Sequence, residues 1–191
     1  MNICVYGASS KDIDISFIKV GEYLGAELAK RNHTVVFGGG DNGMMGAVAR
    51  GVKRENGKII SVVPSFFDID GVIFKNCDEY IFTDTMRERK QIMEEKSDAF
   101  IVTPGGIGTF EEFFEILTLR QLNRHNKPIA ILNTNGYYSH MIAFLNSAVE
   151  NNFMSKENLG LYFLSDNIDE ILNYIEHPTN FKTDIAKLRN I

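Results

Sequence analysis

The sequence predicts an α/β fold: a Rossmann-like, doubly wound parallel sheet with helices on both of its faces. Short apolar runs alternate with segments of helical periodicity along the chain, as in repeated strand–helix–strand units. Three of these runs end in turns rich in glycine or serine, at residues 7–10, 38–43 and 105–108. Because no linker, repeat or low-complexity stretch interrupts the pattern, we expect residues 1–191 to form a single domain.

The first half of the chain supplies three strands and two helices. Residues 3–6 form the first strand, and apolar residues then recur at helical spacing from Phe17 to Leu28. Thr34–Phe37 is the second strand. After the turn at 38–43, Met44 opens a helix of small residues that can pack its backbone close to the sheet. Residues 58–63 form the third strand, which Pro64 stops.

The second half begins with an aperiodic segment, residues 65–78, which carries Phe66, Phe67 and Phe74. Loops of this kind often cover functional sites. Glu79–Thr83 is a short strand, and residues 85–96 form a helix whose first turn has a capping-box pattern. The remaining predicted elements are a buried strand at 99–102, a helix at 109–123, a strand at 129–132, a helix at 138–151, a strand at 161–164 and a helix at 167–175.

Composition and charge exclude several classes of function. The chain is 44% hydrophobic with a net charge of −5, whereas a general nucleic-acid binder is normally basic. No apolar run approaches the ~20 residues that span a bilayer, and the N-terminus lacks a signal-peptide pattern. Metal-ligand spacing is absent, and we expect reduced cysteines and surface or loop histidines, namely Cys4, Cys77, His33, His125, His140 and His177. We therefore expect a soluble, cytoplasmic protein with no nucleic-acid, membrane or metal partner.

The stretch from Pro104 to Glu115 is the strongest candidate for a ligand site. An apolar strand leads into a turn of Gly105, Gly106 and Gly108, and the helix is expected to begin at Thr109. Free N–H groups and the helix dipole converge at such a turn, which makes it an anion site. We therefore predict that a phosphate-bearing ligand binds here. The spacing is neither Gly-x-Gly-x-x-Gly nor the phosphate loop that ends in Gly-Lys-Ser/Thr.

The other two turns should lie beside this one, because ligands of doubly wound sheets bind beyond the carboxyl ends of the strands. The residues of these turns that we expect at the ligand are Gly7, Ser9, Gly39, Gly40, Gly43 and Met44.

Arg89 lies on an apolar helix face, at i+3 from Met86 and i−4 from Met93. A buried guanidinium needs an anionic partner. On one interpretation Arg89 forms an internal ion pair or extends its charged end to solvent. On the other, Arg89 and its neighbour Lys90 bind the phosphate or the leaving group of a substrate.

Glu112 also has two interpretations. It can complete a capping box with Thr109 and return to the backbone N–H of that residue. Alternatively, because Glu111, Glu112 and Glu115 would repel a phosphate, at least one of them faces hydroxyls or a developing positive charge. A ribose that becomes an oxocarbenium ion has both. Thr118 lies i+7 from Glu111 and extends the same face.

Taken together, these segments resemble the LONELY GUY family of cytokinin riboside 5′-monophosphate phosphoribohydrolases, whose members often carry the label lysine decarboxylase. The resemblance extends from residue 3 to about residue 149. Its markers are GGGDNGMMGAVA at 38–49, MRERK at 86–90, PGGIGTFEE at 104–112 and NTNGYY at 133–138.

The resemblance implies a nucleotide-binding domain that hydrolyses the N-glycosidic bond of a nucleoside 5′-monophosphate without a metal or cofactor. It assigns catalysis to Arg89 and Glu112, and phosphate binding to Gly105, Gly106, Ile107, Gly108 and Thr109. It also implies substrate contacts from Lys90, Glu111 and Thr118, and a homodimer. Ile107 and Arg87 depart from the usual family residues. A pyridoxal-type decarboxylase would need a Schiff-base lysine, and the motifs provide none.

A non-catalytic carrier of a nucleotide or of the molybdenum cofactor, built on the same fold, is the alternative. An interaction protein whose apolar helices form a dimer is a third interpretation, compatible with the first. The pair Arg89 and Glu112 favours the enzyme, because a carrier has no need of it at a ribose.

Overall fold

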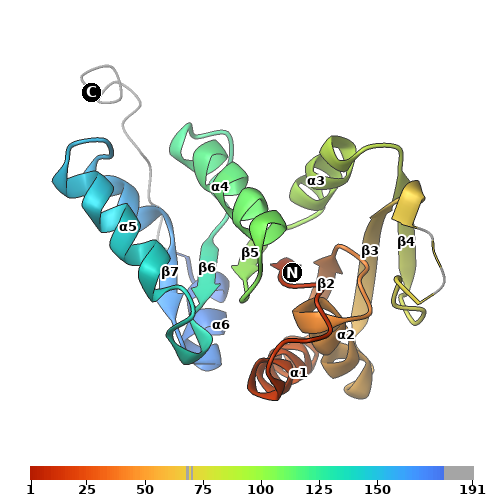
Figure 1. Cartoon of the computed structure of the whole chain (residues 1–191). Helices are drawn as coiled ribbons and strands as arrows, with labels where there is room; N and C mark the ends of the chain where they lie inside the picture. The colour runs from red at the N-terminus through yellow and green to blue at the C-terminus, as the bar shows by residue number, and fades with distance from the viewer. Residues whose placement is uncertain (68, 70, 179–191) are drawn as a thin grey trace.

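The computed structural model of the protein describes residues 1–67, 69 and 71–178. Within these residues, seven parallel strands form one sheet in the order β4-β3-β2-β1-β5-β6-β7. The chain starts in the centre at β1, moves outward to β4, and then crosses back to the other side of β1 (Figure 1). This reversal between β1 and β5 is the point at which doubly wound sheets bind ligands. The strands are β1 (Asn2–Tyr6), β2 (Thr34–Phe37), β3 (Lys58–Pro64), β4 (Glu79–Thr83), β5 (Ala99–Val102), β6 (Ile129–Leu132) and β7 (Phe163–Ser165).

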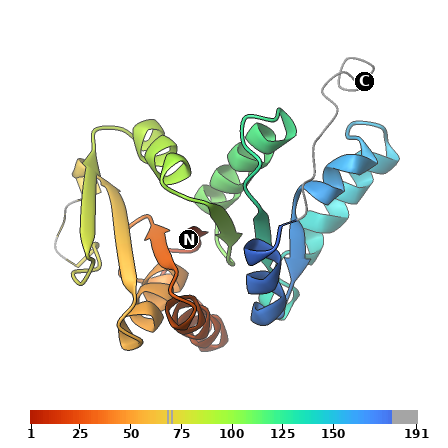
Figure 2. The ribbon, with the colours of Figure 1, turned by 180° about the vertical axis from the view of Figure 1, so that it is seen from behind.

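Helices cover both faces of the sheet, as predicted. They are α1 (Ile15–Lys30), α2 (Gly43–Arg54), α3 (Met86–Glu95), α4 (Ile107–Gln121), α5 (Ser139–Glu150) and α6 (Ile168–Glu176). Figures 1 and 2 show α1, α2 and α6 on one face and α3, α4 and α5 on the other. Alternate residues of each strand point to opposite faces. In β1, Ile3 and Val5 join the core under α1 and α2, while Cys4 and Tyr6 join the core under α3 and α4.

Most predicted boundaries lie within two residues of the observed ones. The last strand, β7, begins two residues later than expected, because residues 156–161 form a short 3-10 helix, η3 (Lys156–Leu161). The capping box of α3 is present in part: Thr85 accepts the N–H of Glu88, but the Glu88 carboxylate accepts the N–H of Asp84 instead of that of Thr85.

The small residues of α2 lie on the sheet, as predicted, and they also let α2 approach the backbone of α1. A Cβ on Gly25 would lie 2.1 Å from the Val48 carbonyl oxygen, and a Cβ on Gly51 would lie 2.0 Å from the Glu22 carbonyl oxygen. The two helices therefore meet backbone to backbone on one face of the sheet.

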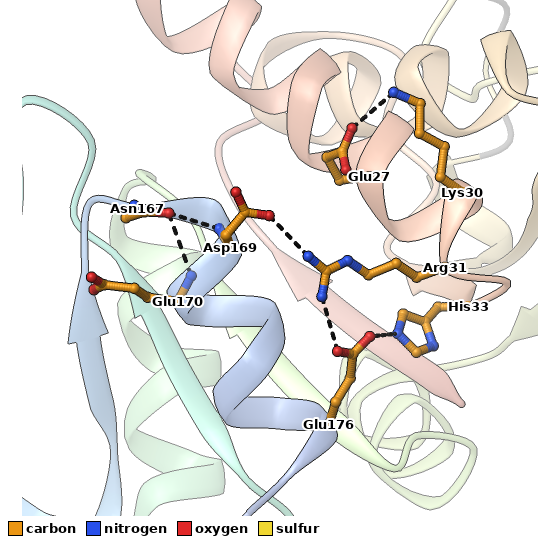
Figure 3. Close-up of polar contacts among 8 residues, drawn as sticks. All are labelled: Glu27, Lys30, Arg31, His33, Asn167, Asp169, Glu170 and Glu176. Carbon is orange, nitrogen blue, oxygen red and sulfur yellow. Dashed lines mark hydrogen bonds and ion pairs between the residues drawn. The ribbon is translucent and has the colours of Figure 1, made fainter.

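Helix α6 is held to the end of α1 by a group of ion pairs (Figure 3). Arg31 lies 2.9 Å from Asp169 and 2.9 Å from Glu176, and His33 Nε2 lies 2.8 Å from the second oxygen of Glu176. The side chain of Asn167 accepts N–H groups from the first turn of α6. His33 lies in the loop before β2, consistent with the expected surface or loop position, but it is buried, at 8% exposed.

His125 also lies in a loop, between α4 and β6, and is buried, at 8% exposed, with Nε2 2.9 Å from the Ile116 carbonyl oxygen. Burial lowers the pKa of His125 to about 4, helped by the charges of Lys127 and Arg120 and opposed by the hydrogen bond to Ile116. Because the unfolded chain binds this proton at the ordinary pKa of 6.5, the folded state loses stability as the pH falls from 6.5 toward 4.

We therefore expect His125→Gln to flatten the dependence of stability on pH. Between about pH 7 and pH 5, the wild type should lose about 1–2 kcal/mol of unfolding free energy that the variant does not lose. Urea unfolding at several pH values measures both slopes. The exposed His140, changed to Gln, is the control, and equal slopes for wild type and His125→Gln would contradict the prediction.

Among the described residues, no helix is both long and apolar enough to cross a membrane. Cys4 and Cys77 are free thiols, and no group of three His, Cys, Asp or Glu residues in the described part is arranged to hold a metal ion.

Candidate active site

The three glycine-rich turns meet around a cavity of about 610 Å³ at the carboxyl edge of the sheet. The turn after β1, the turn after β2 and the start of α4 after β5 form its polar side. An apolar side comes from α2, β3, the loop after β3 and the start of α3. The lining residues are Gly7, Ala8, Ser9, Ser10, Gly38, Gly39, Gly40, Asp41, Asn42, Met45, Val63, Phe67, Val72, Ile73, Met86, Arg89, Gly106, Ile107, Gly108, Thr109, Glu111 and Glu112.

The first turn of α4 forms the anion-binding end of this cavity. The helix begins at Ile107, two residues earlier than predicted, and Gly106 is its N-cap without a side-chain hydrogen bond. The N–H groups of a first helical turn have no partner inside the helix, and those of Ile107, Gly108 and Thr109 donate to no other described residue. No atom lies within 4 Å of a Cβ placed on Gly106 or Gly108. A phosphate can therefore approach this backbone closely.

Arg89 and Glu112 form a buried ion pair that faces the cavity. Arg89 Nη1 donates to Glu112 Oε1 at 2.9 Å, and Arg89 Nε donates to the Val62 carbonyl at 3.2 Å. The side chains are 8% and 10% exposed. They come from α3, which packs on β3 and β4, and from α4, which contacts β1, on the same face of the sheet (Figure 1). Both of our interpretations of Arg89 are compatible with this position, because it has a carboxylate partner and also lines the ligand cavity.

Glu112 is not a helix cap. Because α4 begins at Ile107, Thr109 already lies inside the helix, and the predicted capping box with Glu112 does not form. Burial raises the pKa of Glu112 above its ordinary value, the charge of Arg89 opposes this, and the negative charge of Glu111 adds to it. A buried carboxyl with a raised pKa at a cavity wall is a candidate acid–base group.

Gly38 gives Arg89 the space that its position requires. A Cβ on Gly38 would lie 1.8 Å from Arg89 Nη2. Arg89 cannot move away freely, because its guanidinium is held at Glu112 and at the Val62 carbonyl.

We expect Gly38→Ala to displace this guanidinium and lower kcat by roughly 10²-fold, the lower end of what a positioned acid–base group contributes. Circular dichroism should show an intact fold. Steady-state kinetics of Gly38→Ala measure the effect. The double variant Gly38→Ala/Arg89→Lys tests its cause, since the compact ammonium of lysine has no fork to clash with the new methyl group. If Gly38→Ala is fully active, Gly38 does not position Arg89.

Lys90 points away from this cavity. It forms ion pairs with Glu111 and, at 2.8 Å, with Glu115. It lines a second, smaller cavity of about 340 Å³ between α3 and α4, together with Tyr6, Arg87 and Glu94. Glu111 thus lines the main cavity and also holds Lys90.

Several predicted ligand residues lie elsewhere. Thr118 is exposed and donates to the Phe114 carbonyl at 2.7 Å, away from the cavity lining. Gly105 packs against Thr109 behind the lining residues, and Met44 is buried in the core beside Gly21. Gly43 has φ +61° and abuts the Ala8 carbonyl. Gly105, Gly43 and Met44 thus lie directly behind the lining residues Thr109, Ala8 and Gly7, whereas Thr118 does not.

Gly7, Ser9, Gly39 and Gly40, which we expect at the ligand, line the cavity, and so do the four consecutive residues from Gly106 to Thr109. Sequence reasoning missed Met45, Val63, Val72 and Ile73. The aperiodic apolar segment at 65–78 was the signal for the last two and for Phe67, because we expected it to cover a site. Met45 gave no such signal, since the sequence does not say which of the two adjacent methionines faces the ligand.

The fold and the cavity define a doubly wound α/β protein with a ligand site made of glycine-rich turns at the carboxyl ends of its strands. Residues 45–175 match the family model described as "Possible lysine decarboxylase". The chain belongs to this family, the LONELY GUY (LOG) family.

Two relatives illustrate the similarity. Cytokinin riboside 5′-monophosphate phosphoribohydrolase of Mycobacterium tuberculosis is 36% identical over 89% of this chain and 90% of its own. The Arabidopsis thaliana enzyme of the same name, LOG4, is 35% identical over 96% of this chain and 86% of its own.

Among solved structures, the molybdenum cofactor carrier protein of Chlamydomonas reinhardtii aligns with a TM-score of 0.68 at 21% identity, over 92% of this chain and 95% of its own. The molybdenum cofactor binding protein of Rippkaea orientalis aligns with a TM-score of 0.66 at 20% identity, over 92% of this chain and 93% of its own. At these identities the likeness shows the fold alone.

Proposed function

We propose that the protein is a nucleoside 5′-monophosphate phosphoribohydrolase, which cleaves the N-glycosidic bond to give a free base and ribose 5-phosphate. The observation that carries this proposal is the buried pair of Arg89 and Glu112, which faces the same cavity as the open first turn of α4. A carrier needs N–H donors for a phosphate but no buried carboxylate beside them. The names of the relatives agree with this reaction.

In this proposal the phosphate binds to the N–H groups of Ile107, Gly108 and Thr109. Glu112 follows Thr109 by three residues, just under one helical turn, so the ribose of a phosphate held there lies near its carboxylate. As the bond between C1′ and the base nitrogen breaks, positive charge develops on the ribose and the carboxylate stabilises it.

Water then completes the reaction. Its oxygen bonds to C1′ and Glu112 takes one of its protons, while the base leaves with the electron pair of the broken bond and takes a proton from solvent. Glu112 then returns its proton to solvent, so that one water is consumed for each bond cleaved. Arg89 fixes the carboxylate of Glu112 through Nη1 and keeps positive charge at the cavity wall, where it orients the phosphoribosyl group.

The apolar side of the cavity supports an adenine-type base with an apolar substituent. Phe67, Val72, Ile73 and Met86 line this side, and apolar walls with few polar groups are typical of pockets for such ligands. None of the described cavity-lining residues is a lysine. A pyridoxal Schiff base therefore has no attachment point there.

The test is incubation of the protein with AMP and with isopentenyladenosine 5′-monophosphate, followed by chromatographic detection of the free base and of ribose 5-phosphate. The matching nucleosides, which lack the phosphate, are the control substrates and should be cleaved far more slowly. Tight nucleotide binding without release of a base from any of these substrates would contradict the proposal and favour a carrier.

We also propose a homodimer formed through α5. In this helix, all of which is described, Leu145 alone is buried, whereas Phe144 is 70% exposed and Phe153, just beyond its end, is 82% exposed. Large apolar side chains exposed on one segment are typical of interaction surfaces. Analytical ultracentrifugation should give about twice the chain mass of 21.6 kDa. Phe144→Glu should give the monomer, and a monomeric wild type would contradict the proposal.

The free thiols of Cys4 and Cys77 support a further part of the proposal, that the protein works in the cytoplasm, where thiols stay reduced.

A further inference from the structure

Two adjacent tyrosines hold the phosphate-binding loop from behind. They close the NTNGYY segment, in which η2 (Thr134–Gly136) follows β6. The Tyr137 hydroxyl donates to the Gly105 carbonyl at 2.7 Å, and the Tyr138 hydroxyl donates to the Thr103 carbonyl at 2.7 Å. Neither tyrosine lines the main cavity.

These two hydroxyls complete a set of donors to successive carbonyls of the loop. Between them, the Pro104 carbonyl accepts the N–H of Ala8 at 3.1 Å. In a trans peptide, the C=O of one residue and the N–H of the next point in opposite directions. The N–H of Gly106 therefore points away from Tyr137, and Gly106 itself lines the cavity. The tyrosine hydrogen bond thus holds the peptide that leads directly into the N–H groups of Ile107, Gly108 and Thr109.

The tyrosines are themselves anchored on both sides. The N–H of Tyr138 donates to the Asn133 side chain at 2.8 Å, and its ring is 1% exposed. The ring of Tyr137 packs edge-on against Phe17 of α1, with centroids 6.0 Å apart. Asn135 donates to Ser16 Oγ at 3.0 Å. The segment thus connects β6, the start of α1 and the phosphate loop.

We propose that Tyr137 and Tyr138 are positioning residues that preorganise the phosphate-binding loop, with the Tyr137 hydroxyl setting the affinity for the 5′-phosphate. The inference rests on the proposed function for the identity of the ligand. A loop whose carbonyls are already held loses less conformational entropy when the phosphate binds. Without the hydroxyl, the Gly105–Gly106 peptide can rotate, because glycine restricts it little.

The test compares Tyr137→Phe, which removes the hydroxyl but keeps the ring against Phe17, with the wild type. Calorimetry with ribose 5-phosphate should show about a tenfold higher Kd for the variant, the loss expected for one neutral hydrogen bond. KM for the nucleotide should rise by a similar factor, kcat should change less than about twofold, and Tm should change little. Tyr138→Phe should act in the same direction.

Tyr80→Phe is the matched control, because the Tyr80 hydroxyl also donates to a backbone carbonyl, that of Phe74, at 3.0 Å and outside the phosphate loop. Its affinity for ribose 5-phosphate should equal that of the wild type. If Tyr137→Phe binds ribose 5-phosphate as the wild type does, or loses as much affinity for a nucleoside without phosphate, the positioning role is wrong.

The two proposals fail in different ways. If the wild type binds ribose 5-phosphate but cleaves no nucleotide, the proposed reaction fails, and the Kd comparison still decides the role of Tyr137. If the wild type cleaves nucleotides and Tyr137→Phe binds ribose 5-phosphate unchanged, the positioning role alone fails. A wild type that does not bind ribose 5-phosphate overturns both.

Discussion

Glu112→Gln is expected to keep the fold and to lower kcat by about 10²–10⁴-fold, the range of a positioned acid–base group. The amide has nearly the same shape as the carboxylate and still offers an oxygen to Arg89 Nη1, which now lies 2.9 Å from Glu112 Oε1. It carries no negative charge for the developing oxocarbenium ion and cannot take a proton from water. Circular dichroism and steady-state kinetics with the best nucleotide substrate measure the two parts of the prediction.

Glu111→Gln is the matched control, since it makes the same chemical change at the neighbouring residue. The Glu111 side chain is 54% exposed and pairs with Lys90. We expect an effect of less than about tenfold, because an exposed ion pair contributes little. Equal losses in the two variants would mean that the general charge of the cavity, and not Glu112 itself, supports catalysis.

Arg89→Ala should also lose activity, and it should cost stability. Removing one partner of a buried ion pair leaves an uncompensated charge, at a cost of about 3–5 kcal/mol. Protonation of Glu112 relieves part of this cost, because its pKa is already raised by burial. The loss of stability in Arg89→Ala should therefore shrink as the pH is lowered, and urea unfolding at several pH values checks this.

Gly25→Ala is expected to give the largest loss of stability without any change in the site. On an open helix, this substitution would stabilise the protein by about 1 kcal/mol. At position 25 the new Cβ would lie 2.1 Å from the Val48 carbonyl oxygen, so α1 and α2 must separate. Overpacking of this kind costs about 1–3 kcal/mol, and here the obstacle is backbone that cannot rotate away. Urea or thermal unfolding followed by circular dichroism measures the loss.

Gly108→Ala is the matched control for stability. It also lies in a helix, but a Cβ at this position would meet no atom within 4 Å. Its unfolding free energy should equal or exceed that of the wild type. If Gly25→Ala is as stable as Gly108→Ala, the backbone contact between α1 and α2 does not limit the packing of the protein.

The order of strands and helices could be predicted from the sequence, because each element carries its own signal. Apolar runs of four or five residues, separated by helical periodicity, give the same elements wherever they pack. The start of α4 could not be predicted to the residue. Gly106 offers no side chain to a cap, so Thr109 was the nearest polar residue with a capping pattern. Because the helix begins at Ile107, Thr109 lies inside it, and Glu112 is left to pair with Arg89.

The sequence by itself determined the family, the sheet with its covered faces, and the three turns that meet at one edge, because these depend on local patterns and on the direction of parallel strands. Only the tertiary structure decided which side chains share the cavity. Lys90 follows Arg89 directly, yet Lys90 pairs with Glu111 and Arg89 pairs with Glu112. The two side chains diverge because successive helix residues lie about 100° apart. The role of Tyr137 at Gly105 likewise depends on a contact across 32 positions, which no local pattern encodes.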